Sequence, residues 1–126
     1  MGTRSRIGLE FPDGHVESIY CHWDGYPEHN GRILQSCYND FSSVYQLIQL
    51  GDLSILGESI GEKQDFNRPT EGWCLSYARD RGESDVHAQH HLSWVDYLKT
   101  GEEYNYLFRN GVWLVSGCYT GGFEEF

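Results

Sequence analysis

The chain has 126 residues, of which 39% are hydrophobic and 15% are aromatic. This length fits one domain, residues 1–126, and so many aromatic residues exclude an intrinsically disordered chain. Nineteen acidic residues against nine Lys and Arg give a net charge of −10, which excludes charge-driven binding to nucleic-acid backbones and anionic membranes.

The N-terminal residues predict a β-hairpin. Residues 3–11 and 15–23 alternate between apolar and polar side chains, which is typical of strands. Between them, Pro12 fixes φ, Asp13 can bond to its own backbone, and Gly14 tolerates positive φ. We therefore expect two antiparallel strands joined by a tight turn.

Two helices are predicted to follow. Pro27 suits the first turn of a helix, and the next apolar residues recur at helical spacing. They are Ile33, Leu34, Cys37 and Tyr38. Asp40 can cap a second helix that Gly51 ends. The buried stripe expected for this second helix consists of Phe41, Val44, Leu47 and Ile48.

The middle of the chain is less regular. Residues 57–71 are polar and contain glycines, so they predict a surface loop, and residues 73–78 predict a third strand. Residues 79–89 are charged without an apolar period and predict another loop. Residues 91–99 predict a short helix.

A second hairpin is predicted near the C-terminus. Residues 103–108 and 112–119 alternate, and the dipeptide Asn110-Gly111 between them is a strong signal for a two-residue hairpin turn. We expect residues 121–126 to be a mobile tail. The sequence thus predicts an α+β fold, with about five mostly antiparallel strands and two to three helices packed on one face.

One run of the sequence is rich in residues that carry chemistry. It extends from Tyr20 to Gly31 and joins the end of a predicted strand to the start of a predicted helix, where side chains are exposed and helix N–H groups are free. Such a junction can bind an anion or a partner's side chains. Alternatively, Trp23 and Tyr26 pack in the core or the turn, and Asp24 caps the helix. The predicted binding residues are Arg4, Arg6, Tyr20, His22, Trp23, Asp24, Tyr26, His29 and Asn30.

Two arginines near the N-terminus suggest a different ligand. Arg4 and Arg6 could grip a phosphate, while Trp23 and Tyr26 stack on a base, which predicts a pocket for a small nucleotide. In the alternative interpretation, both arginines lie on the surface and balance nearby acids.

Histidines in the middle of the chain raise the question of a metal. His87 and His91 are four residues apart, and a third metal ligand could come from Asp85 or His22. A metal-dependent hydrolase would be built on His22, Asp24 and the loop of residues 87–91. The glutamate of an HExxH motif is missing between His87 and His91, so a solvated histidine-rich loop is the alternative. No Walker loop, dinucleotide fingerprint or nucleophile elbow is present, and we assign no catalytic residue, cofactor or metal.

The remaining features concern location. The four cysteines contain no CxxC pair, no apolar run approaches the length of a membrane helix, and no signal-peptide core follows the N-terminus. We expect a cytoplasmic protein with reduced cysteines.

The segment MGTRSRIGLEFPDGHVESIYCHWDGYPEHNGRIL, together with EYNYLF and the tryptophan strand after it, resembles a family of small uncharacterised bacteriophage and prophage proteins. The resemblance is most specific over residues 18–34 and does not extend to residues 57–91. It implies an accessory protein that inhibits a host defence or nucleic-acid-processing system by binding a host protein on a basic surface. The sequence leaves open whether the chain forms a homo-oligomer.

Overall fold

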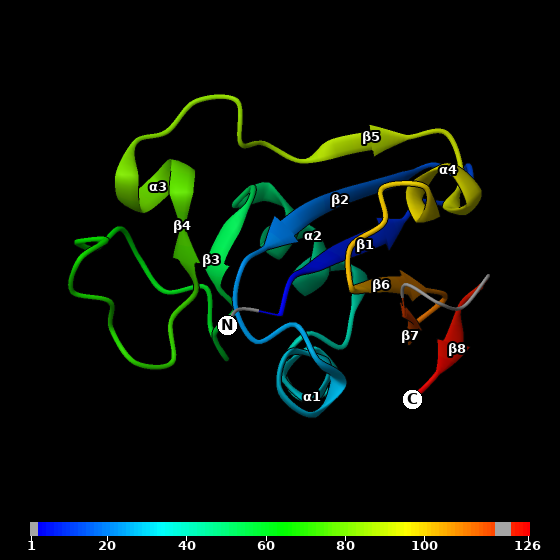
Figure 1. The fold of residues 1–126 in the computed structure, drawn as a ribbon, viewed down its shortest axis with the longest axis horizontal. Coiled ribbons are helices and arrows are strands. Elements are labelled where there is room, and N and C mark those ends of the chain that lie inside the picture. Colours follow the sequence, from blue (N-terminus) through cyan, green and yellow to red (C-terminus); the bar gives the residue numbers. More distant parts are fainter. Residues whose placement is uncertain (1–2, 118–121) are drawn as a thin grey trace.

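The two predicted hairpins lie side by side and form the centre of one sheet (Figure 1). The computed structural model describes residues 3–117 and 122–126. In the sheet, β1 pairs antiparallel with β2 and parallel with β6, so Ile7 lies between Ile19 and Tyr106. The strand order is β4-β3-β2-β1-β6-β7-β8, and β5 also pairs with β2.

The strands of this sheet are mostly antiparallel, and the helices are short. The strands are β1 (Ser5–Glu10), β2 (Val16–Cys21), β3 (Leu53–Ile55), β4 (Leu75–Ser76), β5 (Gln89–His91), β6 (Tyr104–Arg109), β7 (Val112–Gly117) and β8 (Glu124–Glu125). The helices are the π-helical turn η1 (Pro27–Gly31), α1 (Arg32–Cys37), α2 (Phe41–Gln49), α3 (Tyr77–Arg81) and α4 (Trp94–Leu98). The α+β class is confirmed. The prediction of about five strands is wrong, because β3, β5 and β8 are too short for an alternating pattern to stand out.

The two faces of the sheet are covered by different helices. Apolar side chains of the central strands pack with Leu34 of α1 and Leu47 of α2 in the main core. On the opposite face, the Tyr97 ring of α4 lies over Gly8, where an added Cβ would come within 2.9 Å of the ring. Figure 1 is seen from the side of α4, with α2 behind β1 and β2. The expectation that all helices pack on one face is therefore wrong for α4.

Helix α2 begins where the sequence predicts. The Asp40 carboxylate accepts a hydrogen bond from the Ser43 N–H at 2.7 Å and caps the helix. Val44, Leu47 and Ile48 are buried, but Phe41 is 43% exposed. Its place in the predicted buried stripe is wrong, because its ring stacks on the exposed Tyr45 and meets Phe11 edge-on at the margin of the core.

The segment 79–89, predicted as a loop, begins inside α3. This helix is capped by Ser76, whose hydroxyl accepts from the Arg79 N–H at 3.1 Å. Five residues are too few to show an apolar period, so the cap is the main sequence signal. β5 then pairs with residues 16–18 of β2 through two exposed residues and the buried His91.

The C-terminal hairpin is confirmed within the described residues. Asn110 and Gly111 both have positive φ, 50° and 80°, as the predicted turn requires. Residues 118–119 of the predicted strand lie outside the described residues, and so does Gly121. The tail expected to be mobile contains β8, which pairs with Leu114 and Val115.

Candidate functional site: a tryptophan-lined pocket beyond β2

The predicted site residues begin where β2 ends, and the chain there continues along β3. The His22 N–H donates to the Leu53 carbonyl at 3.0 Å, and the Trp23 N–H donates to the Ser54 carbonyl at 3.1 Å. Because side chains alternate along an extended chain, Trp23 projects toward the same face as Cys21, which is the face covered by α1 and α2. His22 projects toward the other face, where its Nδ1 lies 2.7 Å from the Tyr20 hydroxyl.

A tight turn follows Trp23. Asp24 has a φ of 56°, and Gly25 lies so close to β1 that an added Cβ would come within 2.7 Å of the Ser5 Cβ. The Gly25 carbonyl accepts a hydrogen bond from the Tyr106 hydroxyl at 2.6 Å. Only glycine fits against β1 at this point, and the turn holds Trp23 at the surface, where it is 41% exposed.

A buried asparagine fixes the same turn from inside. Asn30 is fully buried, and its amide donates to the Trp23 carbonyl at 3.1 Å. Its side-chain oxygen lies 2.9 Å from Nδ1 of His29, and its N–H donates to the Asp24 carbonyl at 3.2 Å. The π-helical turn η1 thus carries the residue that closes the loop from Trp23 to His29.

The facing wall is the loop of residues 57–73. The indole of Trp73 lies against Gly61, where an added Cβ would come within 2.4 Å of the ring. The Ser59 N–H donates to the Gly72 carbonyl at 3.0 Å, and the Cys74 N–H donates to the Ser59 carbonyl at 2.9 Å. The loop therefore folds back on itself and holds Trp73 in a defined position.

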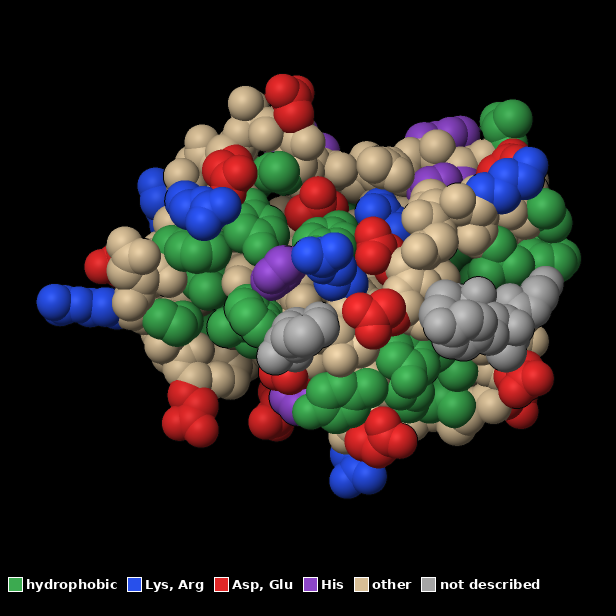
Figure 2. All heavy atoms as spheres, in the orientation of Figure 1, with side chains coloured by type: hydrophobic (Ala, Val, Ile, Leu, Met, Phe, Trp, Pro, Cys, Tyr) green, Lys and Arg blue, Asp and Glu red, His purple; other side chains and the backbone are tan. Residues whose placement is uncertain are grey.

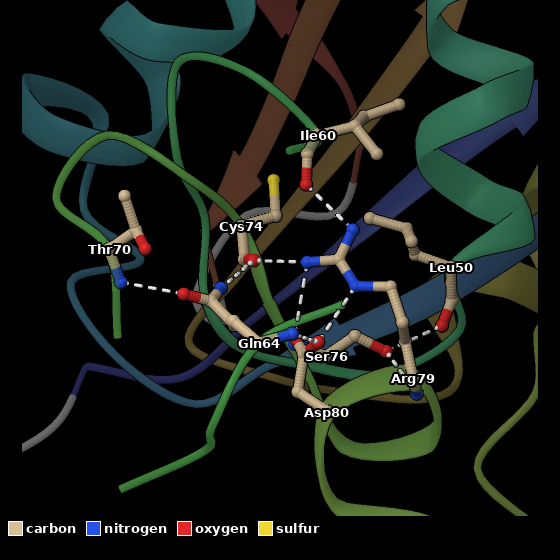
Figure 3. A network of polar contacts seen from close by, with 8 residues as sticks. All are labelled: Leu50, Ile60, Gln64, Thr70, Cys74, Ser76, Arg79 and Asp80. Carbon is tan, nitrogen blue, oxygen red and sulfur yellow. Dashed lines mark hydrogen bonds and ion pairs between the residues drawn. The ribbon is translucent and has the colours of Figure 1, made fainter. Parts of the chain in front are cut away.

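An ion pair attaches this loop to α3 (Figure 3). The Arg79 guanidinium lies 2.9 Å from the Asp80 carboxylate and also donates to the Ile60 and Cys74 carbonyls, both at 2.7 Å. The Asp80 carboxylate accepts from the Gln64 N–H at 3.1 Å. Burial alone would raise the pKa of Asp80, but hydrogen bonds from Arg79 and the backbone outweigh it and lower that pKa.

Between these two walls lies a cavity of about 440 Å³. Its lining combines two tryptophans, one histidine, three acidic residues and apolar side chains from α1 and β3. The lining residues are Trp23, Asp24, His29, Ile33, Ile55, Leu56, Gly57, Glu58, Pro69, Thr70, Glu71, Gly72 and Trp73. Figure 2 shows hydrophobic, acidic and basic side chains together over this end of the molecule. The size suits a small ligand or a side chain of a partner.

The ionisable residues that line the cavity are all acidic apart from His29. Asp24, Glu58 and Glu71 line it, and the described lining contains no Lys or Arg. Within residues 3–117 and 122–126, none of the three carboxylates forms an ion pair or a side-chain hydrogen bond. The cavity is therefore suited to a cationic group and unfavourable for a phosphate.

A second hollow, of about 630 Å³, lies beside the first hairpin turn. Two of its lining residues are acidic, but both are engaged. Glu10 binds Arg109 through two hydrogen bonds, at 2.9 and 3.0 Å, and Asp40 caps α2. Because both acids are engaged, this second hollow is less suited to a cationic ligand than the tryptophan-lined pocket.

Three of the nine predicted binding residues line the tryptophan-lined pocket: Trp23, Asp24 and His29. Asn30 does not line the pocket but holds the Trp23 backbone by a hydrogen bond, whereas Tyr26 is exposed and lies outside the lining. The alternative interpretation puts Trp23 in the core or the turn; the structure places it beside the turn at Asp24, with its side chain exposed and not in the core.

The remaining predicted residues lie elsewhere. Arg6 is buried on the face opposite α2 and donates to the Ser18 hydroxyl at 3.0 Å, which lies 2.7 Å from Nε2 of His91. Arg4 is exposed, and its N–H donates to the Glu103 carboxylate at 3.4 Å. Neither arginine lines the pocket that contains Trp23, so the four residues predicted to grip a nucleotide do not converge there.

The two candidate metal ligands are in different environments. His87 is exposed, whereas His91 is buried against Ser18. Burial and the charge of Arg6 lower the pKa of His91. Across the part of the chain that the structure describes, no group of three His, Cys, Asp or Glu side chains is placed to share a metal ion.

Sequence reasoning missed one wall of the pocket. Glu58 and Glu71 lie in a segment that the sequence predicts only as a surface loop, and Trp73 is the first residue of a predicted strand. The signal available was a tryptophan directly after Gly72, in a stretch where Gly57 and Gly61 permit close approach.

No known protein family, curated protein or solved structure matches this chain. None of the helices within the described ranges has the length and apolar character needed to cross a bilayer.

Proposed function

We propose that this chain is a non-enzymatic accessory protein of the phage type, which binds a basic surface of a host protein and inhibits a host defence or nucleic-acid-processing system. The observation that carries the proposal is the pocket between Trp23 and Trp73. Its three carboxylates have no cationic partner among the described residues. The exposed Trp23 and the partly buried Trp73, next to unpaired acids, favour a partner that supplies both apolar surface and positive charge.

The overall charge supports the same kind of partner. A net charge of −10 on 126 residues attracts a basic surface over a distance of about one Debye length and accelerates encounter. A channel that normally holds nucleic acid is such a surface, and an acidic protein lodged there would block it by charge complementarity.

A small-nucleotide-binding protein is the second candidate, because of Arg6. This residue is 6% exposed and forms no ion pair with the described residues. A buried guanidinium favours an anion nearby. The positive charge of Arg6 already lowers the pKa of Asp52, although burial of that carboxyl raises it more strongly. The Asp52 carboxyl thus compensates part of the charge of Arg6 within the chain itself. A ligand anion is needed less for that reason, so nucleotide binding is the second candidate.

The proposal is tested by capturing host proteins on the immobilised chain and eluting them with rising salt. We expect a basic host protein that is retained at about 0.1 M salt and released well before about 1 M, because screening weakens exposed charge pairs. Duplex DNA should compete with the chain for that protein. Retention that does not change with salt or with DNA would contradict the proposal.

A further inference from the structure

We infer that the pocket between Trp23 and Trp73 receives an arginine side chain of the partner. This inference rests on the proposed function and names the group that the pocket recognises. It follows from three observations: unpaired carboxylates, exposed aromatic rings, and a repeated pattern of arginine binding within this chain.

The carboxylates of the pocket are not paired with a cation of the described chain. Elsewhere in the described chain, Glu10 is paired with Arg109 and Asp80 with Arg79. The pocket acids Asp24, Glu58 and Glu71 have no such partner in residues 3–117 and 122–126. An arriving guanidinium can pair with them without displacing an existing ion pair.

The aromatic rings add an attraction specific to cations. Trp23 is 41% exposed, and Trp73 is partly buried against Gly61. An indole attracts a cation to its face more strongly than the rings of tyrosine or phenylalanine do. A guanidinium can also stack flat on the indole, whereas an ammonium cannot, so the pocket favours arginine over lysine.

The chain binds its own arginines in the same way at two places. Arg109 pairs with Glu10, and its guanidinium carbon lies 5.7 Å from the centroid of the Trp94 ring. Arg81 pairs with Glu83, and its guanidinium lies over the rings of Phe66 and Tyr77, at 4.5 and 4.8 Å. Each site consists of one carboxylate, at least one ring and one arginine.

The tryptophan-lined pocket has the carboxylates and the rings of such a site, and the arginine is missing among its described lining residues. The walls are also fixed before a ligand arrives. Asn30 holds the Trp23 wall, and the Arg79–Asp80 pair holds the loop that carries Trp73. A site held in place in this way loses little conformational entropy on binding, so a single side chain can contribute measurably.

The experiment uses two capped peptides that differ only in charge. One is acetyl-Gly-Arg-Gly-amide, and the other replaces arginine by citrulline, which has nearly the same shape and no charge. Each is titrated into the full chain while the indole N–H signals of Trp23 and Trp73 are followed by NMR, after assignment with Trp23→Phe and Trp73→Phe. We expect saturable shifts of both signals with the arginine peptide, at roughly tenfold lower concentration than with citrulline.

Matched variants separate the pocket from general acidity. The double variant E58Q/E71Q should weaken binding of the arginine peptide severalfold. Glu125→Gln removes an exposed acid at the opposite end of the sheet and should leave binding unchanged (Figure 1). Equal binding of both peptides, or shifts of indoles outside the pocket alone, would overturn the inference.

The outcome also distinguishes this inference from the proposed function. If salt-sensitive capture of a basic host protein persists while the arginine peptide fails to bind, the partner uses another part of the acidic surface, and only the pocket assignment is overturned. If the peptide binds but no basic protein is captured, the inference stands and the proposed function is overturned.

Discussion

The side-chain amide of Asn30 donates a hydrogen bond to the main-chain carbonyl of Trp23, at 3.1 Å. A fully buried polar residue of η1 thus fixes the backbone of the exposed tryptophan in the pocket. The same amide lies 3.4 Å from the Cys21 sulfur, so the contact also joins η1 to the end of β2.

The first prediction concerns this asparagine. Asn30→Ala removes the amide donor, leaves the Trp23 carbonyl with only the weak donor of the Cys21 thiol at 3.7 Å, and should lower the free energy of unfolding by about 2 kcal/mol. Asn39→Ala is the matched control, because Asn39 is exposed and donates only to the Ser36 carbonyl at 3.2 Å. Urea unfolding followed by circular dichroism measures both. Equal effects of the two substitutions would contradict the structural role of Asn30.

The second prediction concerns the contact between Gly61 and Trp73. Gly61 and Gly82 both have positive φ, 69° and 70°, so alanine at either position costs about 1 kcal/mol in backbone strain. At Gly61 the added Cβ would also come within 2.4 Å of the Trp73 ring, whereas it would meet nothing within 4 Å at Gly82 apart from its chain neighbours. Gly61→Ala should therefore destabilise more than Gly82→Ala and should shift the indole signal of Trp73, which Gly82→Ala should leave unchanged. An unchanged Trp73 signal in Gly61→Ala would show that the ring does not lie there.

The third prediction concerns the ion pair that holds the loop. The Asp80 side chain is fully buried, and Asp80→Asn leaves the charge of Arg79 uncompensated, which should cost about 3 kcal/mol. Glu83→Gln breaks the exposed pair with Arg81 and should cost less than about 1 kcal/mol.

The ion pair also has a predictable dependence on pH. The folded-state pKa of Asp80 lies below its ordinary value of 3.8, so the carboxylate contributes stability above pH 3.8 and loses it as pH falls through the folded-state pKa. The difference in unfolding free energy between wild type and Asp80→Asn should therefore be constant near neutral pH and shrink below about pH 4. A difference that grows on acidification would contradict the assignment.

The fourth prediction concerns His91, whose pKa lies below its ordinary value of 6.5 because of burial and the charge of Arg6. Protonation then favours the unfolded chain, so His91 contributes stability above pH 6.5 that is lost as pH falls. Replacing it by glutamine should remove this loss between about pH 7.5 and pH 5, measured by urea unfolding at each pH. His15 should behave in the opposite way, because hydrogen bonds to Asp13 and Glu17 outweigh its burial and raise its pKa.

Local signals in the sequence predict much of this fold. The turn at Asn110-Gly111, the cap at Asp40 and the alternation along β1 and β2 each report on a few neighbouring residues, and each is observed. The parallel pairing of β1 with β6 is different, since it joins residues almost one hundred positions apart. Neither hairpin contains a sequence signal that says which of its strands pairs with the other hairpin.

The candidate site could be predicted only in part, for the same reason. Trp23, Asp24 and His29 belong to one short run, and the junction of strand and helix draws attention to it. The facing wall comes from a loop with no regular secondary structure. Its position depends on the Arg79–Asp80 pair and on glycines that accept close contacts, and these contacts are formed only in the folded chain.

The most direct test of the proposed function is native mass spectrometry of the tagged chain, captured gently from host cells, side by side with the E58Q/E71Q variant. We expect a complex of the chain with a basic host protein, which is depleted in the variant. A chain that carries the mass of a nucleotide or a metal ion, with no protein partner in either sample, would contradict the proposed function and favour the nucleotide-binding or metal-dependent alternatives.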